Sequence, residues 1–557
     1  MLTSRQRSLW LVCAAFWLVC AAFSILPSTA FAESGNSRSE WPMFGQNEQN
    51  TASNEVERII STSNVATLAP KWVATTGGDV SARAAVVGGA VYFPDFGGNL
   101  WALDADTGAV IWQHQLSDYG LSAGTVSRTS PAVHGDSVYI GTQAGAYLLA
   151  INAKTGDLRW KTQLDSSTGA VLTGSPAVLD EVVYIGVSGV GQEAAAASNS
   201  FECCMFRGSA VAVSARTGVI LWQTYMAPPG YSGVSVWGSN PVVDARRKTV
   251  FIGAGNNFST PTTSAYVNCI LAGGTQKACL SPDDHVDSVI ALDMNTGKVK
   301  WSQRLTDGDD FNVACGGQGH TNPVGKNCPF PAGADFDFGS APNEFSVRVP
   351  EARGHQDGRR DFIGAGQKSG MYSAFDPDTG DFLWGTQVGP GGTLGGIEWG
   401  SATDGERVYV AIANSSHLQY TAGTGVGTAG SWSALDPTTG EILWQTPDPN
   451  GAVAGLSGSP PGSPPPVDPN GAVDTGPMTV ANGVVYAPSM GAATASTPNM
   501  FALDAKTGKV LWSFPSGGSV QAGAVVVDGT VYWGSGYGRL GFVAGQKKFY
   551  AFSLGGK

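Results

Sequence analysis

"WALDADTGAVIW", at residues 101–112, decides the fold, because variants of it recur along the whole chain. Each copy has an alanine, an apolar residue, usually Asp or Asn, then Thr-Gly, and a tryptophan four residues after the glycine. The other six copies are LAINAKTGDLRW (149–160), VAVSARTGVILW (211–222), IALDMNTGKVKW (290–301), SAFDPDTGDFLW (373–384), SALDPTTGEILW (433–444) and FALDAKTGKVLW (501–512). Such internal repetition indicates a protein built from repeated structural units.

Each copy predicts a β-hairpin. The Asp or Asn side chain accepts hydrogen bonds from the turn backbone, and the glycine adopts the positive φ that the turn requires. The tryptophan at the end of the second strand offers a large flat ring that can wedge between neighbouring units. A second hairpin pattern, such as AVHGDSVYIG (132–141), precedes most copies, so each unit should contain about four strands.

An eighth unit is split between the two ends of the chain. LAPKWVA (68–74) carries Trp72 without a Thr-Gly strand before it, while VVVDGTVYWG (525–534) and KKFYAFSL (547–554) lack a final tryptophan strand. Joining them would close a ring without a free sheet edge. We therefore predict an all-β, eight-bladed β-propeller whose N- and C-terminal strands close the last blade; a seven-bladed ring is the alternative. The Pro-rich stretch at 455–470 should be an exposed loop within a blade.

The first 32 residues have the features of an export signal. Arg5 and Arg7 precede a long apolar run, which ends in an A-x-A pattern at Ala30 and Ala32. This predicts a signal peptide over 1–32, a single propeller domain over 33–557, and a periplasmic or secreted protein. A retained membrane anchor is the alternative. No later apolar run reaches the roughly 18 residues that a membrane span needs.

Charge and cysteine content narrow the possible partners. The formal net charge is −12, and removing the two arginines of residues 1–32 takes it to −14. This argues against nucleic acid, whose phosphates need a basic face. Six cysteines remain, an even number that indicates disulfides in an oxidising compartment. Sequence does not fix their connectivity, but proximity favours Cys203–Cys204, Cys269–Cys279 and Cys315–Cys328.

Segments outside the repeats carry a more specific resemblance. They are WPMFGQNEQNT (41–51), SRTSPAV (127–133), ECCMFRGS (202–209), VWGSNPVVD (236–244) and GIEWGSATDG (396–405). Together with the repeats, they resemble quinoprotein alcohol dehydrogenases over essentially all of the chain after residue 32, and most closely those that act on polyvinyl alcohol. The resemblance implies pyrroloquinoline quinone (PQQ) and Ca²⁺ bound in the ring axis.

PQQ is a flat anion with three carboxylates, so it needs flat walls and cationic partners. In this family a disulfide between adjacent cysteines forms one wall, a role that falls here to Cys203–Cys204, and a tryptophan forms the other, here Trp237 ahead of GAGNN (253–257). Pairing of the two thiols elsewhere and a packing role for Trp237 are the alternatives.

Three more residues are expected at the cofactor by the same resemblance. Lys368 matches a cation that hydrogen-bonds the quinone oxygens. Arg128 is expected to pair with a PQQ carboxylate, because a guanidinium offers bidentate geometry. Trp399 is expected to line the cavity. For Lys368 and Arg128 the alternative is a structural or surface ion pair.

The metal ligands carried over from the family are Glu193, in GVSGVGQE, and Asn256, in GAGN. Their oxygen donors suit calcium, and a bound Ca²⁺ would polarise the quinone carbonyl. Ala314 stands where lanthanide-using relatives have an additional Asp, which favours calcium. An exposed loop position is the alternative for Glu193.

The general base is the point at which this sequence departs from the family pattern. Relatives use an Asp about eleven residues after the tryptophan of the fourth repeat, and the corresponding residue here is Asn312. An amide cannot accept the proton, so we expect Asp309 or Asp310 to take over this catalytic role if the loop is arranged differently.

The expected function is therefore a periplasmic PQQ- and Ca²⁺-dependent dehydrogenase. It would oxidise a secondary alcohol, polymeric or small, to a ketone. No C-x-x-C-H haem motif is present, so a separate cytochrome c is implied as electron acceptor. The alternatives are a non-catalytic propeller that scaffolds protein assembly at a membrane, and a propeller hydrolase or lyase. A scaffold would have no use for the adjacent cysteines, Trp237 and Asn256 together.

Overall fold

The computed structural model describes most of the chain after the first 38 residues. The described ranges are 39–238, 240–316, 325–349, 358–451, 472–491, 496–538 and 545–557. They belong to one compact unit, Arg38–Lys557. The predicted signal peptide (1–32) and the Pro-rich loop (455–470) lie outside the described residues. Within these ranges, no helix combines the length and apolar character required to cross a membrane.

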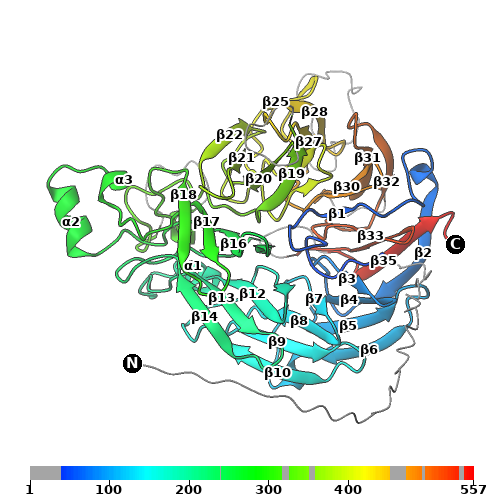
Figure 1. Cartoon of the computed structure of the whole chain (residues 1–557), viewed down its shortest axis with the longest axis horizontal. Helices are drawn as coiled ribbons and strands as arrows, with labels where there is room; N and C mark the ends of the chain where they lie inside the picture. The colour runs from blue at the N-terminus through cyan, green and yellow to red at the C-terminus, as the bar shows by residue number, and fades with distance from the viewer. Residues whose placement is uncertain are drawn as a thin grey trace, which may run out of the picture. The chain divides into compact units, whose positions relative to one another are not determined.

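The strands form eight four-stranded antiparallel sheets, arranged around a common centre (Figure 1). The first four blades are β3 (Ala85–Val87), β4 (Ala90–Pro94), β5 (Asn99–Asp104) and β6 (Val110–Gln115); β7 (Ala132–His134), β8 (Ser137–Gly141), β9 (Tyr147–Asn152) and β10 (Leu158–Gln163); β11 (Ala177–Leu179), β12 (Val182–Val187), β13 (Ser209–Ser214) and β14 (Ile220–Tyr225); and β15 (Val242–Asp244), β16 (Thr249–Gly253), β17 (Ser288–Asp293) and β18 (Val299–Arg304).

The remaining four blades follow the same order. They are β19 (Asn343–Arg348), β20 (Arg359–Gly366), β21 (Met371–Phe375) and β22 (Phe382–Gln387); β23 (Ala402–Thr403), β24 (Val408–Ile412), β27 (Ser431–Leu435) and β28 (Ile442–Pro447); β29 (Thr479–Ala481), β30 (Val484–Pro488), β31 (Met500–Asp504) and β32 (Val510–Phe514); and β33 (Val525–Val527), β34 (Thr530–Gly534), β35 (Lys548–Leu554) and β2 (Leu68–Thr75).

Few elements stand outside the blades. A short strand β1 pairs parallel with β29, and β25 and β26 form a separate hairpin. These elements and the described helices are β1 (Ser53–Asn54), β25 (Tyr420–Ala422), β26 (Gly425–Gly427), α1 (Val190–Ala195), α2 (Ser264–Leu271), α3 (Gln276–Cys279) and the 3₁₀ turns η1 (Val65–Thr67), η2 (Leu116–Tyr119) and η3 (Val313–Cys315).

The two ends of the chain close the ring. β2 pairs antiparallel with β35, with Trp72 opposite Ala551. The indole of Trp512 in the seventh blade donates to the backbone oxygen of Leu68 in the closing strand at 3.1 Å. The predicted eight-bladed ring with a shared last blade is therefore confirmed.

Tryptophans join each blade to the next. Eight indole N–H groups donate to a backbone oxygen of the following blade at 2.9–3.2 Å; the tryptophans are 72, 112, 160, 222, 301, 384, 444 and 512. The Thr-Gly turn lies against the indole of the preceding blade. At Gly508, whose φ is +71°, an added Cβ would come within 2.5 Å of the Trp444 ring. Glycine is thus required there both by the backbone and by the ring that covers it.

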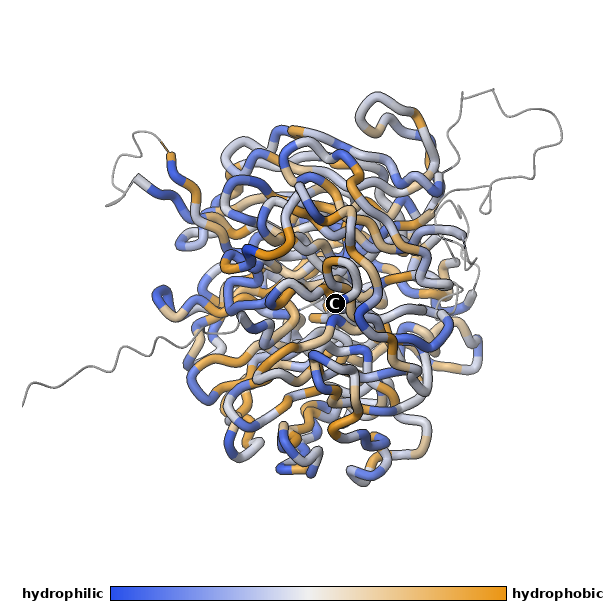
Figure 2. The backbone as a smooth tube through the Cα atoms, turned by 90° about the vertical axis from the view of Figure 1, so that its right-hand side faces the viewer, coloured by the Kyte–Doolittle hydropathy of each residue, from blue (hydrophilic) through white to orange (hydrophobic). Residues whose placement is uncertain are grey.

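Burial follows the position of a strand in its blade. The second strands, such as β4, β8 and β24, are buried along their whole length. The outermost strands, such as β6 and β14, expose much of their surface. Figure 2 shows hydrophilic residues gathered in loops at the edges of the molecule, with apolar segments running between them. The core is therefore distributed between the blades.

Three disulfides form, with the pairing that proximity favoured. They are Cys203–Cys204, Cys269–Cys279 and Cys315–Cys328. The second connects α2 to α3 in a long insertion of the fourth blade, which Figure 1 shows projecting from the ring.

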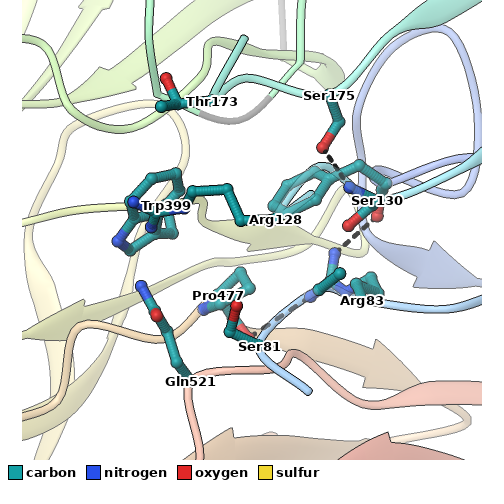
Figure 3. Close-up of a pocket in the computed structure, with 11 residues that line it drawn as sticks. Ser81, Arg83, Arg128, Ser130, Thr173, Ser175, Trp399, Pro477 and Gln521 are labelled. Atoms are coloured by element: carbon teal, nitrogen blue, oxygen red, sulfur yellow. Dashed lines mark hydrogen bonds between the residues drawn. The ribbon is translucent and has the colours of Figure 1, made fainter. Parts of the chain in front are cut away.

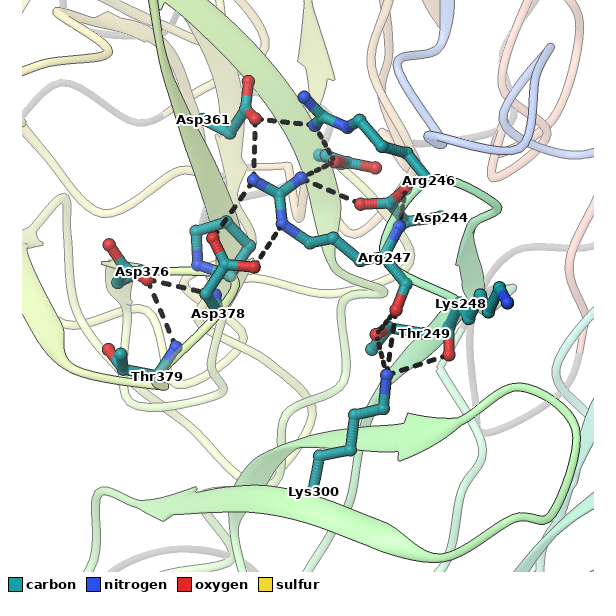
Figure 4. Close-up of polar contacts among 12 residues, drawn as sticks. Asp244, Arg246, Arg247, Lys248, Thr249, Lys300, Asp361, Asp376, Asp378 and Thr379 are labelled. Carbon is teal, nitrogen blue, oxygen red and sulfur yellow. Dashed lines mark hydrogen bonds and ion pairs between the residues drawn. The ribbon is translucent and has the colours of Figure 1, made fainter. Parts of the chain in front are cut away.

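An ion-pair cluster connects the fourth and fifth blades (Figure 4). Arg247, at the turn between β15 and β16, bonds Asp244 and Asp361 at 2.8 Å and Glu344 at 3.2 Å. It also meets Asp378 at 2.8 Å. Burial opposes ionisation of Asp361, but its hydrogen bonds with Arg247 and its neighbours outweigh that effect and lower the pKa to about 2. At pH values above the pKa of Asp361 in the unfolded chain, the ionised carboxylate therefore stabilises the folded state. This stability is lost as the pH falls toward the folded-state pKa of about 2.

Replacing Arg247 should destabilise the ring strongly, because it would leave buried carboxylates without their cation. We expect Arg247→Met to cost about 3–5 kcal/mol. Arg246→Met is the matched control, since Arg246 is 65% exposed and also pairs with Asp361; it should cost less than about 1 kcal/mol. Thermal unfolding midpoints at pH 7 measure both, and equal losses would contradict the assignment.

Candidate active site

One repeat position points a residue of each blade toward the ring axis. It is the fourth residue before the first strand of each blade, in segments that we call the axial loops. These residues are Ser81, Arg128, Thr173, Gly238, Gly339, Glu398, Thr475 and Gln521. Five of them line one cavity, and Ser81 lines a smaller chamber beside it. The repeat that builds the blades therefore also builds the site.

Of the two glycines at this position, Gly339 makes room for Trp237, and Gly238 allows the close approach of the Gly339 backbone. A Cβ added at Gly339 would lie 2.9 Å from the Trp237 ring, and one at Gly238 would strike the carbonyl of Gly339. At Gly339, in the fifth blade, the indole occupies the space that a side chain would fill. Trp237 is thereby held as a flat wall of the cavity.

The axial cavity has a volume of about 420 Å³. Aromatic, acidic and basic side chains meet in it. Trp237 and Trp399 lie 5.2 Å apart with their rings at 73°, and the guanidinium of Arg128 lies 3.8 Å above the Trp399 ring. Figure 3 shows Arg128 over Trp399, between Thr173 and Gln521, where the smaller chamber of about 20 Å³ adjoins the cavity.

Lys368 organises the acidic side of the cavity. Its ammonium lies 2.9 Å from Asp335 and 3.2 Å from Asp337. Asp337 also accepts the Trp237 indole N–H at 2.8 Å and the backbone N–H of Asn256 at 2.6 Å. Asp337 is thus fixed in place by its donors, while Asp335 meets Lys368 on the cavity wall.

Burial shifts the acids of this site strongly. It raises the pKa of Glu193 to about 7, with Lys368 opposing and Asp337 adding to the shift. It also raises the pKa of Asp335 and of Glu398. Four carboxylates line the cavity against two basic side chains, Lys368 and Arg128. The site therefore carries an excess of acid that a divalent cation would neutralise.

The carboxylates do not form a complete metal site by themselves. In the part of the chain that the structure describes, no three acidic, histidine or cysteine side chains are arranged to hold a metal ion. A cation here would need further oxygen donors, such as those of a bound ligand. This requirement fits a metal held jointly by protein and cofactor.

Five of the predicted residues meet in the cavity. Arg128, Glu193, Trp237, Lys368 and Trp399 all line it. Asn256 lies just behind its wall, where its amide donates to the backbone oxygen of Phe311 at 2.6 Å and its backbone N–H bonds Asp337.

The Cys203–Cys204 disulfide lies beside the cavity lining. Gln192 of α1 accepts the backbone N–H groups of Met205 and Phe206 at 3.0 Å, which ties the disulfide segment to the helix that carries Glu193. The Asn312 amide lies 3.9 Å from the sulfur of Cys203. Both neighbours of Asn312 in the chain, Phe311 and Val313, line the cavity.

The two predicted bases, Asp309 and Asp310, and Asn312 at the family's base position all lie in supporting structure, and none of them lines the cavity. Asp309 accepts the backbone N–H groups of Asp335 and Phe336 at 3.1 and 2.7 Å, so it shapes the loop that carries Asp335. Asn312 donates to the backbone oxygens of Phe258 and Asn327 at 2.8 and 2.9 Å.

Asp310 is also buried away from the cavity lining. Its backbone forms an isolated parallel β-bridge with Asn257. Burial raises the pKa of the Asp310 carboxyl to about 6. The carboxylates that do line the cavity near Lys368 are Asp335 and Asp337, which the sequence analysis missed. Both lie in the loop before β19, upstream of Gly339, so no position of the repeat marked them in the sequence.

Comparisons with known proteins agree with this geometry. A family model for PQQ-type repeats, described as outer membrane protein assembly factor BamB, matches residues 47–303 and 368–547. Polyvinylalcohol dehydrogenase of Pseudomonas sp is 30% identical over 536 residues, 89% of this chain and 74% of the relative. Polyvinylalcohol dehydrogenase of Sphingopyxis sp. (strain 113P3) is 31% identical over 390 residues, 67% of this chain and 54% of the relative.

The solved structures share the fold. Quinohemoprotein alcohol dehydrogenase from Comamonas testosteroni superposes with a TM-score of 0.64 at 20% identity, covering 93% of this chain and 81% of the other. Ring, repeat and cavity define a propeller of the PQQ-repeat class. The chain belongs to the family of PQQ-dependent alcohol dehydrogenases that contains the polyvinylalcohol dehydrogenases.

The contact between Gly339 and Trp237 can be tested by adding one methyl group at Gly339. Gly339→Ala should push the indole out of place, an overpacking cost of about 1–3 kcal/mol, and weaken PQQ binding about tenfold or more. Gly425→Ala in the β25–β26 hairpin is the control, because an added Cβ there meets only the Ala422 backbone oxygen, at 3.8 Å. Fluorescence titration with PQQ measures both. Unchanged affinity in Gly339→Ala would show that Trp237 is not held by this contact.

Proposed function

We propose that this protein oxidises secondary alcohols to ketones with PQQ and Ca²⁺ in the axial cavity and passes the electrons to a separate cytochrome c. The observation that carries the proposal is the cavity itself, where an indole wall, two cations and four carboxylates meet on the ring axis. Such a combination suits a flat anionic cofactor together with a metal ion.

The residues present fit PQQ. Trp237 offers a flat face, and the disulfide lies close to the cavity at α1. Arg128, held over Trp399, would pair with a carboxylate of the cofactor. The chemistry that PQQ supplies when bound is acceptance of a hydride from the alcohol carbon. Lys368 would stabilise negative charge that develops on the quinone oxygens.

The same cavity supplies oxygen donors for a hard cation. Glu193 lines it, and Asn256 presents its amide oxygen from just behind the wall. Carboxylate and amide oxygens are ligands that Ca²⁺ prefers. Neutralisation by Ca²⁺ also accounts for burying so many acids together, since unpaired buried charges are costly.

Asp335 is our candidate for the base that takes the hydroxyl proton. It lines the cavity, and Lys368 favours its charged form at 2.9 Å. Asp337 is engaged by Trp237 and Asn256, so it positions its neighbours. Asp309 holds the loop that presents Asp335. The proton acceptor would therefore come from the fifth blade.

The rim of the cavity suits an alcohol on a carbon chain. Val190, Val313 and Leu394 all line it and stay about two-fifths exposed. Apolar groups at the rim would bind alkyl segments on either side of a hydroxyl. This favours a secondary alcohol within a longer chain, as in polyvinyl alcohol, over a very small alcohol.

A separate cytochrome c in the periplasm is the proposed acceptor. Among the relatives is methanol dehydrogenase [cytochrome c] subunit 1 of Methylobacterium organophilum, 25% identical over 338 residues. The acidic net charge of −12 would attract a basic partner. The scaffold alternative draws support from the family description that names an assembly factor, but it gives the buried acids and cations of the cavity no role.

Reconstitution tests the proposed function directly. The full chain mixed with PQQ and Ca²⁺ should reduce a dye when a secondary alcohol is added, and EDTA should abolish the reaction. PQQ binding without turnover, over a range of secondary alcohols and polyvinyl alcohol, would refute the enzyme. No PQQ binding at all would favour the scaffold.

Asp335→Asn should lower kcat by about 10²–10⁴-fold, because the amide cannot accept a proton. PQQ affinity should change little. Asp310→Asn is the matched control and should keep most of the activity, since Asp310 is buried outside the cavity lining. The reverse ranking of the two variants would return the role of base to Asp310.

A further inference from the structure

We propose a second cation site, between the sixth and seventh blades, built on Asp448 and Asp474 and suited to Ca²⁺. Asp448 follows β28, and Asp474 lies in the axial loop before β29. Neither residue belongs to the cofactor cavity. The inference does not depend on the proposed function.

Both carboxylates are buried without the partners that burial requires. Asp474 is 0% exposed, and neither of its oxygens makes a hydrogen bond; Asp448 is 2% exposed, and its Oδ2 makes none. The other oxygen of Asp448 accepts the backbone N–H of Asn450 at 2.7 Å. Unpaired buried carboxylates cost several kcal/mol, so three unsatisfied oxygens call for a ligand.

Neutral oxygen donors surround the pair. The Ser489 hydroxyl and the Asp448 carboxyl lie close enough to Asp474 to affect its ionisation, but neither makes a well-formed hydrogen bond with it. Asn499 lies opposite Ser489, whose backbone N–H it accepts at 2.8 Å. Asn499 is 0% exposed, its amide donates to Gly491 at 3.2 Å, and its Oδ1 is also without a hydrogen bond. The Asn499 amide oxygen is a neutral group, yet like the carboxylate oxygens it is buried without a donor. It therefore also calls for a ligand at this place.

The chemistry favours a cation over a hydrogen-bonded acid pair. Among the described residues, neither Asp448 nor Asp474 forms an ion pair with a basic side chain, and the charge that acts most strongly on Asp474 is that of Asp448. The nearby Tyr420 hydroxyl is itself buried without a hydrogen bond and feels the charge of both acids. A single shared proton would satisfy one oxygen of each carboxyl, and would leave the second oxygen of Asp474 and the amide oxygen of Asn499 unpaired. A cation bound only by oxygens would satisfy several at once, and this donor set matches Ca²⁺.

Such a cation would lock three segments together. It would join the end of the sixth blade at Asp448, the axial loop at Asp474 and the end of β30 at Ser489. Thr475, the next residue after Asp474, lines the cofactor cavity. The site would therefore stabilise the cavity wall from behind.

Calcium binding to the full chain, stripped with a chelator and free of PQQ, tests the site. Isothermal titration with CaCl₂ should show one more bound Ca²⁺ per chain in the wild type than in Asp474→Asn. Calcium should raise the unfolding midpoint of the wild type more than that of the variant, since a ligand that binds only the folded state stabilises it. Glu441→Gln, an exposed acid of the sixth blade, is the matched control and should behave as the wild type.

The outcomes separate cleanly. Equal calcium stoichiometry in the wild type and Asp474→Asn would overturn the site, whatever happens at the cofactor. If Asp474→Asn does not fold, Asp448→Asn provides the same comparison. Glu193→Gln addresses only the cofactor cavity and should leave the Asp474-dependent calcium in place, so failure of one site is distinguishable from failure of the other.

Discussion

The structure depends on one contact made eight times, in which an indole N–H of one blade bonds a backbone oxygen of the next. At seven of the eight contacts the ring also lies against a Thr-Gly turn that has no room for a side chain, and this close packing fixes one blade against the next. Because the last copy closes onto Leu68, the N-terminal strand becomes part of the ring. Because the ring closes without a free edge, the axial loops of all eight blades are arranged around one common axis.

Function follows from where those loops end. One position of the repeat lies beside the axial cavities in six of the eight blades, and its residue type varies from blade to blade without disturbing the blades. Gly339 of the fifth blade leaves space for Trp237, and acidic and basic side chains line the same cavity. The scaffold is thus set by the repeat, and the chemistry by the departures from it. The buried acids of the cavity are stable only with cations nearby.

Much of this could be predicted from the sequence. The repeat predicted the blades, their number and the shared last blade, because turn chemistry and tryptophan spacing are local signals. Arg128, Trp237, Lys368, Trp399 and Glu193 were expected at one site by resemblance, and the structure places them around one cavity. The base was harder to predict. Asp309 and Asp310 lie next to the site in sequence, but a loop from the fifth blade brings Asp335 to the axis instead, a tertiary arrangement that spacing along the chain does not encode.

The central claim is that the closed ring holds a flat cofactor against Trp237 on its axis. A crystal structure of the chain reconstituted with PQQ and Ca²⁺ tests it most directly. The account predicts planar density stacked on the Trp237 indole, with Arg128 and Lys368 at its edges and the Cys203–Cys204 disulfide on its other side. PQQ bound elsewhere on the molecule, with this cavity filled only by solvent, would contradict it.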